Sequence, residues 1–147
     1  MKIAMGSDHG GFGHKEQIKK HLEENGFDVI DFGTNSSDGV DYNDYAIKVS
    51  EAVVKGEVDK GILVCGTGIG MSIQANKVNG IRAALVLDLF TAEATRLHND
   101  TNVLAMGGRV ISVEQAIKIV DIWVNTKFSN EDRHIRRISK IDNYKGE

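Results

Sequence analysis

The sequence predicts an α/β protein in which a parallel sheet lies between two layers of helices, a three-layer α/β/α arrangement. Short apolar runs alternate with longer amphipathic runs along the chain. One of these runs, residues 61–65, is apolar throughout, as in strands that are buried on both faces. The strand–helix order repeats five times, and parallel strands joined by crossover helices carry those helices on both faces of the sheet.

Each expected strand is a short apolar or alternating run, and each expected helix has apolar residues three or four positions apart. The expected strands are residues 2–6, 27–32, 61–65, 81–87 and 102–107. The expected helices are residues 12–25, 43–55, 70–77, 91–98, 112–125 and 131–141. Asn25-Gly26 is a typical stop signal for the first helix. No repeat or interdomain linker is present, so we expect residues 1–147 to form one domain.

Length, composition and charge exclude several classes of protein. The 147 residues are 41% hydrophobic and 27% charged, which is typical of a globular chain that buries its own core. No apolar run approaches the roughly 18 residues of a membrane span, and no secretory signal is apparent. With one cysteine and 18 basic against 21 acidic residues, we expect a cytoplasmic protein that binds neither nucleic acid nor membranes.

Polar and glycine-rich segments follow three of the expected strands. They are residues 7–11, 65–70 and 107–109, and a fourth polar segment, 96–100, precedes the last strand. Ligands of open parallel sheets bind beyond the carboxyl ends of the strands, so these segments could converge on one crevice. Asp8-His9 alone supplies too few ligands for a metal site.

The glycine-rich segment 66–70 opens a helix, and its free N–H groups make an anion site. Met71 stands where a dinucleotide fingerprint needs glycine, and the Gly-Lys-Ser/Thr ending of a nucleotide-binding phosphate loop is missing. Cys65 directly precedes this segment. A lone cysteine is more often a buried hydrophobic residue, but a thiol at a helix N-terminus has a lowered pKa and can act as a base.

Basic side chains near the C-terminus supply a second part of the pattern. Arg133 and Arg137 are four residues apart and share a helix face, which makes either a phosphate clamp or an ordinary solvated surface. His98 and Asn99 could bind a ligand or cap the end of a helix. Together with the thiol and the glycine segment, these groups suit proton abstraction next to a carbonyl of a phosphorylated small molecule.

Six segments in combination resemble the type B ribose-5-phosphate isomerases of the ribose/galactose isomerase family, with similarity from Lys2 to about Ile141. The segments are residues 7–11, 41–46, 65–70, 75–77, 80–83 and 96–104. The resemblance implies a Rossmann-like five-stranded sheet with strand order 2-1-3-5-4 and no metal or organic cofactor. It also implies a homodimer or dimer of dimers, with the active site at the subunit interface and a sugar phosphate as substrate.

The resemblance assigns a role to each candidate residue. Cys65 would move a proton between C2 and C1, Thr67 would help with hydroxyl protons, and His98 would open the sugar ring. The backbone of Gly66, Gly68, Ile69 and Gly70 would hold the enediolate. The implied sugar contacts are Asp8, Tyr42 and Asn99, and the implied phosphate contacts are His9, Arg109, Arg133, His134 and Arg137.

Two departures from the family pattern are visible. Asn43 replaces a proline that many relatives carry, and Met71 stands where some relatives have a glutamate base, which leaves Cys65 as the candidate base. The expected reaction interconverts ribose 5-phosphate and ribulose 5-phosphate in the non-oxidative pentose phosphate pathway. Two alternatives stay open: an isomerase of allose 6-phosphate or another sugar or sugar phosphate, and a non-catalytic nucleotide-binding module in which Asp88 holds a ribose.

Overall fold

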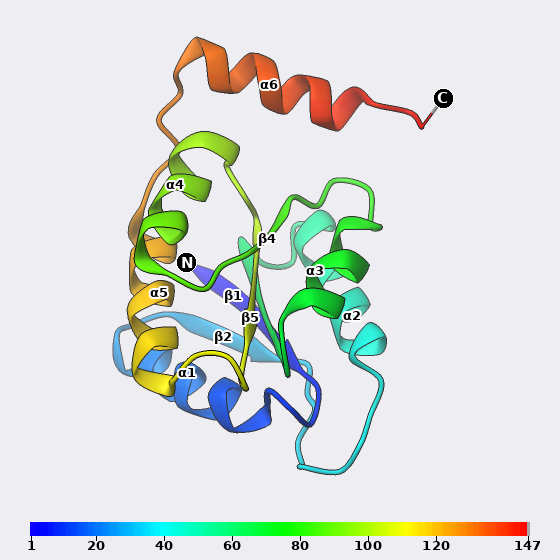
Figure 1. The fold of residues 1–147 in the computed structure, drawn as a ribbon, viewed down its shortest axis with the longest axis vertical. Helices are drawn as coiled ribbons and strands as arrows, with labels where there is room; N and C mark the ends of the chain where they lie inside the picture. Colours follow the sequence, from blue (N-terminus) through cyan, green and yellow to red (C-terminus); the bar gives the residue numbers. More distant parts are fainter. Residues whose placement is uncertain (147) are drawn as a thin grey trace.

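Five parallel strands form the centre of the computed structural model, which describes residues 1–146 (Figure 1). They are β1 (Lys2–Ser7), β2 (Asp28–Asp31), β3 (Lys60–Cys65), β4 (Ala83–Leu85) and β5 (Val103–Gly107). The order across the sheet is β2-β1-β3-β5-β4, and each neighbouring pair is parallel. The expected α/β fold and strand order are therefore confirmed.

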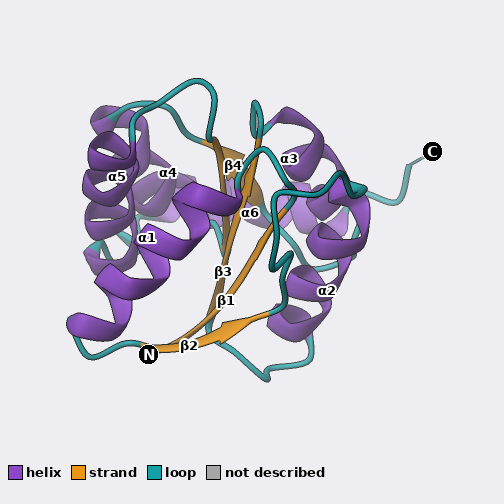
Figure 2. Cartoon of the chain, turned by 90° about the horizontal axis from the view of Figure 1, so that it is seen from below, coloured by secondary structure: helices purple, strands orange, loops and turns teal. Residues whose placement is uncertain are grey.

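Helices cover both faces of the sheet (Figure 2). On one face lie α1 (Phe12–Glu24), α4 (Leu89–Asn99) and α5 (Val113–Asn125), and on the other lie α2 (Tyr42–Val54) and α3 (Ile69–Asn76). The last helix, α6 (Asp132–Asn143), belongs to neither layer and stands beyond α4 at one end of the sheet (Figure 1). Within residues 1–146, no helix has the length and apolar character that crossing a membrane requires.

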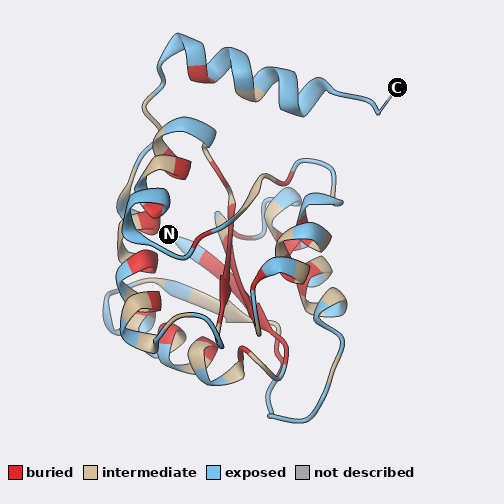
Figure 3. Ribbon diagram, viewed as in Figure 1, coloured by how far each residue is buried: buried red, intermediate tan, exposed pale blue. Residues whose placement is uncertain are grey.

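The central strand β3 contributes to two separate cores because its side chains alternate between the faces of the sheet. Ile62 and Val64 pack with Trp123 of α5 in one core, whereas Leu63 and Cys65 pack with α2 and α3 in the other. The buried residues form a continuous band along the sheet in Figure 3. Because β3 is held from both sides, the position of Cys65 at its carboxyl end is fixed.

The fourth strand is shorter than the sequence predicts. We expected residues 81–87, whereas β4 contains only Ala83–Leu85. Before the strand, the Ile81 N–H donates to Val78 O in a turn (3.1 Å), and the Arg82 N–H donates to the side chain of Asn102 (2.9 Å). Side-chain and turn hydrogen bonds thus replace ladder pairing at the start of this edge strand.

A buried ion pair, which the sequence did not reveal, holds α1 against the end of β2. The Lys15 side chain is fully buried, and its Nζ lies 2.7 Å from Asp31 Oδ2. Burial alone would raise the pKa of the Asp31 carboxyl, but hydrogen bonds from Lys15 and the Gly33 N–H, with the charges of Lys15 and Lys19, lower it. Removing one partner of such a pair leaves an uncompensated buried charge, so the pair fixes this corner of the sheet.

Candidate active site

Three loops meet at the carboxyl ends of β1, β3 and β5, as the sequence predicts. Cys65 ends β3 and pairs with Gly107 in β5. The loop after β5 is joined to the loop after β3, because the Gly108 N–H donates to Cys65 O (2.8 Å) and the Arg109 N–H donates to Gly66 O (2.9 Å). The loop after β1 begins with an Asp8 N–H that donates to Val64 O (3.2 Å). We call this region the Cys65 end.

Glycine is required where these loops cross. A Cβ at Gly11 would lie 2.2 Å from Val64 O, and a Cβ at Gly107 would lie 2.6 Å from Thr67 O. Both distances are far below van der Waals contact, and both neighbours are main-chain atoms that cannot move aside. The glycines therefore let backbone groups of three strands approach one point, as a small-ligand site needs.

The thiol of Cys65 lies against the N-terminus of α3. Its side chain is nearly buried, and Sγ accepts a hydrogen bond from the Gly68 N–H at 3.1 Å. Gly68 has a φ of 80°, which turns the chain into the helix and aims this N–H at the sulfur. The exposed Thr67 hydroxyl accepts a hydrogen bond from the Ile69 N–H (3.2 Å). A negative charge on this sulfur would be stabilised by a hydrogen bond and by the helix dipole.

Free N–H groups lie beside the thiol. The N–H groups of Gly66 and Gly70 donate no hydrogen bond to any part of the chain that the structure describes. The guanidinium of Arg109 flanks Gly66, since Nη1 would lie 3.3 Å from a Cβ at that position. The ring of Tyr42 covers Gly70, where a Cβ would lie 2.5 Å from the ring. The segment can thus hold an oxyanion between an arginine and an aromatic ring.

The side chains of Asp8 and His9 complete the Cys65 end. Asp8 is buried, and its Oδ1 accepts hydrogen bonds from the N–H groups of Gly10 (2.8 Å) and Gly11 (3.1 Å). Its Oδ2 accepts none from the described residues, which leaves that oxygen available to a ligand. His9 is exposed, and its Nδ1 accepts a hydrogen bond from the Val40 N–H (3.2 Å), so Nε2 carries the proton toward solvent.

His98 and Asn99 lie at the opposite end of the sheet, near the amino ends of the strands. They form the last turn of α4, and the C-cap residue that follows them, Asp100, has a φ of 45°. This turn precedes the first residue of β5, whereas Cys65 pairs with its last residue. The five residues of β5 alone separate the two places by roughly 13 Å. The expectation that segment 96–100 converges with the three loops is therefore wrong for a single chain.

The basic residues of α6 lie with His98. The rings of His98 and His134 stack with centroids 4.5 Å apart and an interplanar angle of 20°. His134 is buried, and its Nε2 has no hydrogen-bond partner among the described residues. Burial and the positive charges of Arg133 and Arg137 lower the pKa of His134. Arg133 forms an ion pair with Glu131, and both arginines are exposed. We call this region the His98 end.

A cavity of about 750 Å³ adjoins the His98 end beneath the far half of α6. Its lining includes Asn99, Arg82 and Asp142. The sequence places Arg82 only in an expected strand and in the family resemblance. No role was expected for its side chain, because its partner Asp142 lies 60 positions away and leaves no local signal. Among residues 1–146, no group of three or more His, Cys, Asp or Glu side chains is arranged to hold a metal ion.

Comparison with known proteins agrees with this geometry. A family model described as Ribose/Galactose Isomerase matches residues 3–141. The chain therefore belongs to the ribose/galactose isomerase family, whose resemblance the sequence had suggested.

Individual relatives match along nearly the whole chain. A putative sugar phosphate isomerase of Bacillus subtilis is 56% identical over 145 residues, covering 98% of this chain and 97% of the relative. Ribose-5-phosphate isomerase B of Escherichia coli is 51% identical over 140 residues, covering 95% and 93%. The structure of ribose-5-phosphate isomerase B from Mycoplasma genitalium, with bound ribulose 5-phosphate, is 43% identical, with a TM-score of 0.94 and coverage of 97% and 95%.

Proposed function

We propose that this protein is an aldose–ketose isomerase that interconverts ribose 5-phosphate and ribulose 5-phosphate. The observation that carries the proposal is the thiol of Cys65, held 3.1 Å from an N–H at a helix N-terminus and beside the free N–H groups of Gly66 and Gly70. Two relatives with coverage above nine tenths have ribose-5-phosphate isomerase B as their name, and one of them was solved with the ketose product. The pentose phosphate pathway is the expected context.

Proton transfer takes place at the Cys65 end. The thiolate removes the proton from C2 of the open aldose. The electron pair of that C–H bond forms the C1–C2 double bond while the π pair of the C1 carbonyl moves onto O1, which gives an enediolate. The free N–H groups of Gly66 and Gly70 face the developing oxyanion. The thiol then returns the proton to C1, while the hydroxyl proton of O2 is transferred to O1 and the C2 carbonyl of the ketose forms. Thr67 assists the transfer of the hydroxyl proton, while Asp8 and Tyr42 hold the sugar.

Ring opening and most of the phosphate binding belong to the His98 end. His98 is exposed at the end of α4 and can act as the general acid that protonates the ring oxygen of the closed aldose. Asn99 lies beside it to contact the sugar. Arg133 and Arg137 provide charge for the phosphate, with His134 next to them. His9 and Arg109 contribute phosphate contacts from the Cys65 end.

The active site is built from two copies of the chain. One chain holds Cys65 and His98 at opposite edges of its sheet, so no single sugar phosphate reaches both within that chain. A two-fold homodimer, alone or paired into a tetramer, brings the His98 end of one copy to the Cys65 end of the other and makes two equal sites. Apolar side chains that are exposed in the single chain support a further contact surface. They are Ile69, Ile73, Leu87, Leu89 and Phe90, and Phe90 is 78% exposed.

The reaction needs no metal or organic cofactor in this scheme, because main-chain N–H groups can stabilise the enediolate. Activity is expected to persist in EDTA. The enzyme is expected in the cytoplasm, where sugar phosphates are metabolised.

A substrate panel tests the proposed function. The ratio kcat/KM is measured for ribose 5-phosphate, allose 6-phosphate, free ribose and free allose, and Cys65→Ala serves as the control for a contaminating isomerase. We expect ribose 5-phosphate to give the highest kcat/KM and Cys65→Ala to remove the activity. A higher value for allose 6-phosphate would move the assignment to a six-carbon substrate. Thermal stabilisation by nucleotides, without isomerase activity, would favour the nucleotide-binding alternative.

A further inference from the structure

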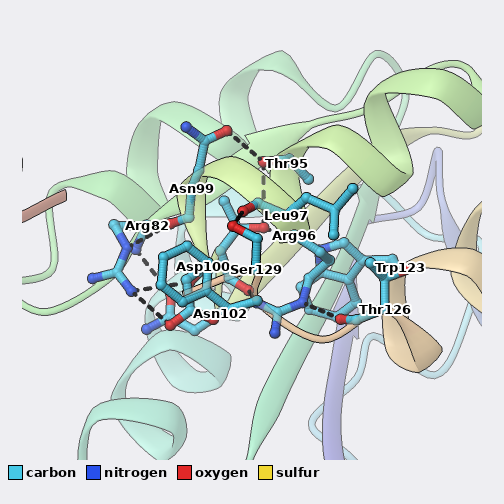
Figure 4. A network of polar contacts seen from close by, with 12 residues as sticks. Arg82, Thr95, Arg96, Leu97, Asn99, Asp100, Asn102, Trp123, Thr126 and Ser129 are labelled. Carbon is cyan, nitrogen blue, oxygen red and sulfur yellow. Dashed lines mark hydrogen bonds and ion pairs between the residues drawn. The ribbon is translucent and has the colours of Figure 1, made fainter. Parts of the chain in front are cut away.

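Arg82 joins three elements at the His98 end, and the proposed mechanism gives it no role. It precedes β4, and its side chain is only 18% exposed. Nε donates to Asn99 O (3.0 Å), and Nη2 donates to Asp100 O (2.9 Å). Nη1 donates to both carboxylate oxygens of Asp142 in α6 (3.1 and 2.9 Å). Figure 4 shows Arg82 facing the end of α4 from the side.

The first two hydrogen bonds cap the C-terminus of α4. The last carbonyl groups of a helix have no partner within the helix, and a positive charge there also interacts favourably with the helix dipole. The main chain itself supplies two capping bonds, from the Asp100 N–H to Arg96 O (3.3 Å) and from the Ser129 N–H to Leu97 O (3.4 Å). Arg82 takes the carbonyls of Asn99 and Asp100 that these bonds leave free. It therefore fixes the turn that carries His98 and Asn99.

The bonds to Asp142 hold the far end of α6. Near its first turn, α6 is attached to α4 by the stack of His134 on His98. Asp142 lies eight residues further on, roughly 12 Å along the helix axis. A helix attached at one point can pivot about it, whereas two attachments this far apart fix its direction. Arg137 lies between the two attachments, and Arg133 lies beside the first.

We propose that Arg82 is a positioning residue that holds the end of α4 and the helix α6 in one fixed geometry. This inference rests on the proposed function, because it concerns His98 and the arginines assigned there to ring opening and phosphate binding. Arg82 touches neither of those groups directly. It acts through Asn99 and Asp100 on α4 and through Asp142 on α6, which predicts two separable effects.

Two variants separate these effects. Asp142→Asn removes the charge from the α6 attachment and leaves the α4 cap in place. We expect it to raise KM for ribose 5-phosphate about 3- to 10-fold, as for loss of a partly exposed bidentate pair, and to leave kcat within about twofold. Its activity on free ribose should not change. Arg82→Gln also removes the α4 cap, so we expect kcat for ribose 5-phosphate to fall about 10- to 100-fold, because small displacements of a catalytic group are costly.

Arg82→Lys and Glu114→Gln are the matched controls. Arg82→Lys keeps the charge but lacks the planar fork, so its kcat should lie between those of wild type and Arg82→Gln. Glu114→Gln breaks an exposed ion pair with Lys118 on α5 and should change neither KM nor kcat. Circular dichroism and Tm verify that each variant is folded at the assay temperature.

The outcomes distinguish this inference from the proposed function. If wild type does not isomerise ribose 5-phosphate, the proposed function fails and the Arg82 inference fails with it. If wild type is active but folded Arg82→Gln keeps its kcat and KM within about twofold, Arg82 positions nothing. An equal loss of activity by Asp142→Asn on free and phosphorylated ribose, or a loss that follows Tm alone, would show a merely structural role and overturn the inference.

Discussion

Combining two impaired variants in one dimer should restore activity on ribose 5-phosphate if each active site takes residues from two chains. The first variant is Cys65→Ala, which removes the thiol at the Cys65 end, and the second is His98→Asn, at the other edge of the sheet. In a two-fold dimer of one chain of each kind, one site combines both substitutions. The other site combines neither, because its Cys65 comes from the second chain and its His98 from the first.

The expected yield follows from this arrangement. A purified heterodimer has one intact site of two, so it should show about half of the wild-type activity per dimer. A mixture formed by free exchange of equal amounts contains heterodimers as about half of all dimers, which gives about a quarter of the wild-type activity. If every site were built within one chain, neither mixture would exceed the low activity of the parent variants. The separation of the two ends by the length of β5 is the reason that we expect the first outcome.

The assay uses coexpressed chains with two different affinity tags, purified in sequence to retain heterodimers. Ribose 5-phosphate is the substrate, since the aldose direction needs both ends. A matched control pairs His98→Asn with a chain that carries both substitutions, because those heterodimers keep one Cys65 but contain no His98, and so show the activity that remains without ring opening. Activity of the test heterodimer no higher than this control would refute the two-chain site.

Four further predictions concern single residues. Cys65→Ala should fold but lose activity by about 10²–10⁴-fold, the usual contribution of a general base; activity within a few-fold of wild type would require another base. Arg137→Ala should raise KM for ribose 5-phosphate and leave weak activity on free ribose unchanged, whereas an equal loss on both would indicate a structural role. With His98→Asn, the aldose rate should stop rising with enzyme concentration at the ring-opening rate in solution, while the ketose rate stays proportional to enzyme. Proportional aldose rates beyond that limit would exclude His98 as the ring opener. Burial, with the charge of Arg96, lowers the pKa of Lys60 to about 8. Between pH 8 and 10.5 the folded state therefore binds fewer protons than the unfolded chain. The stability of the folded state rises with pH across that window. Lys60→Met should therefore raise Tm most at or below pH 8, with a gain that shrinks toward pH 10.5; a gain independent of pH would exclude this cause.

The fold and the Cys65 end were predictable because their signals are local. A continuous apolar run specifies a central strand, and the glycines after it permit the close approach of neighbouring loops. The contacts that sequence reasoning missed are long-range. Nothing around Lys15 indicates that its ammonium is fully buried against Asp31, and nothing around Arg82 indicates that its partner is Asp142. Such pairs depend on how helices pack, which a single sequence does not encode in any short window.

The separation of Cys65 from His98 has a different origin, because it follows from the connectivity of the fold. In a parallel sheet, each crossover helix returns the chain from the carboxyl ends of the strands to their amino ends. A residue at the end of a crossover helix must therefore lie opposite a residue at the end of a strand. His98 ends the helix before β5, and Cys65 ends β3, so their opposite placement could have been derived once the elements were assigned. For this fold, a site that needs both residues requires a second chain.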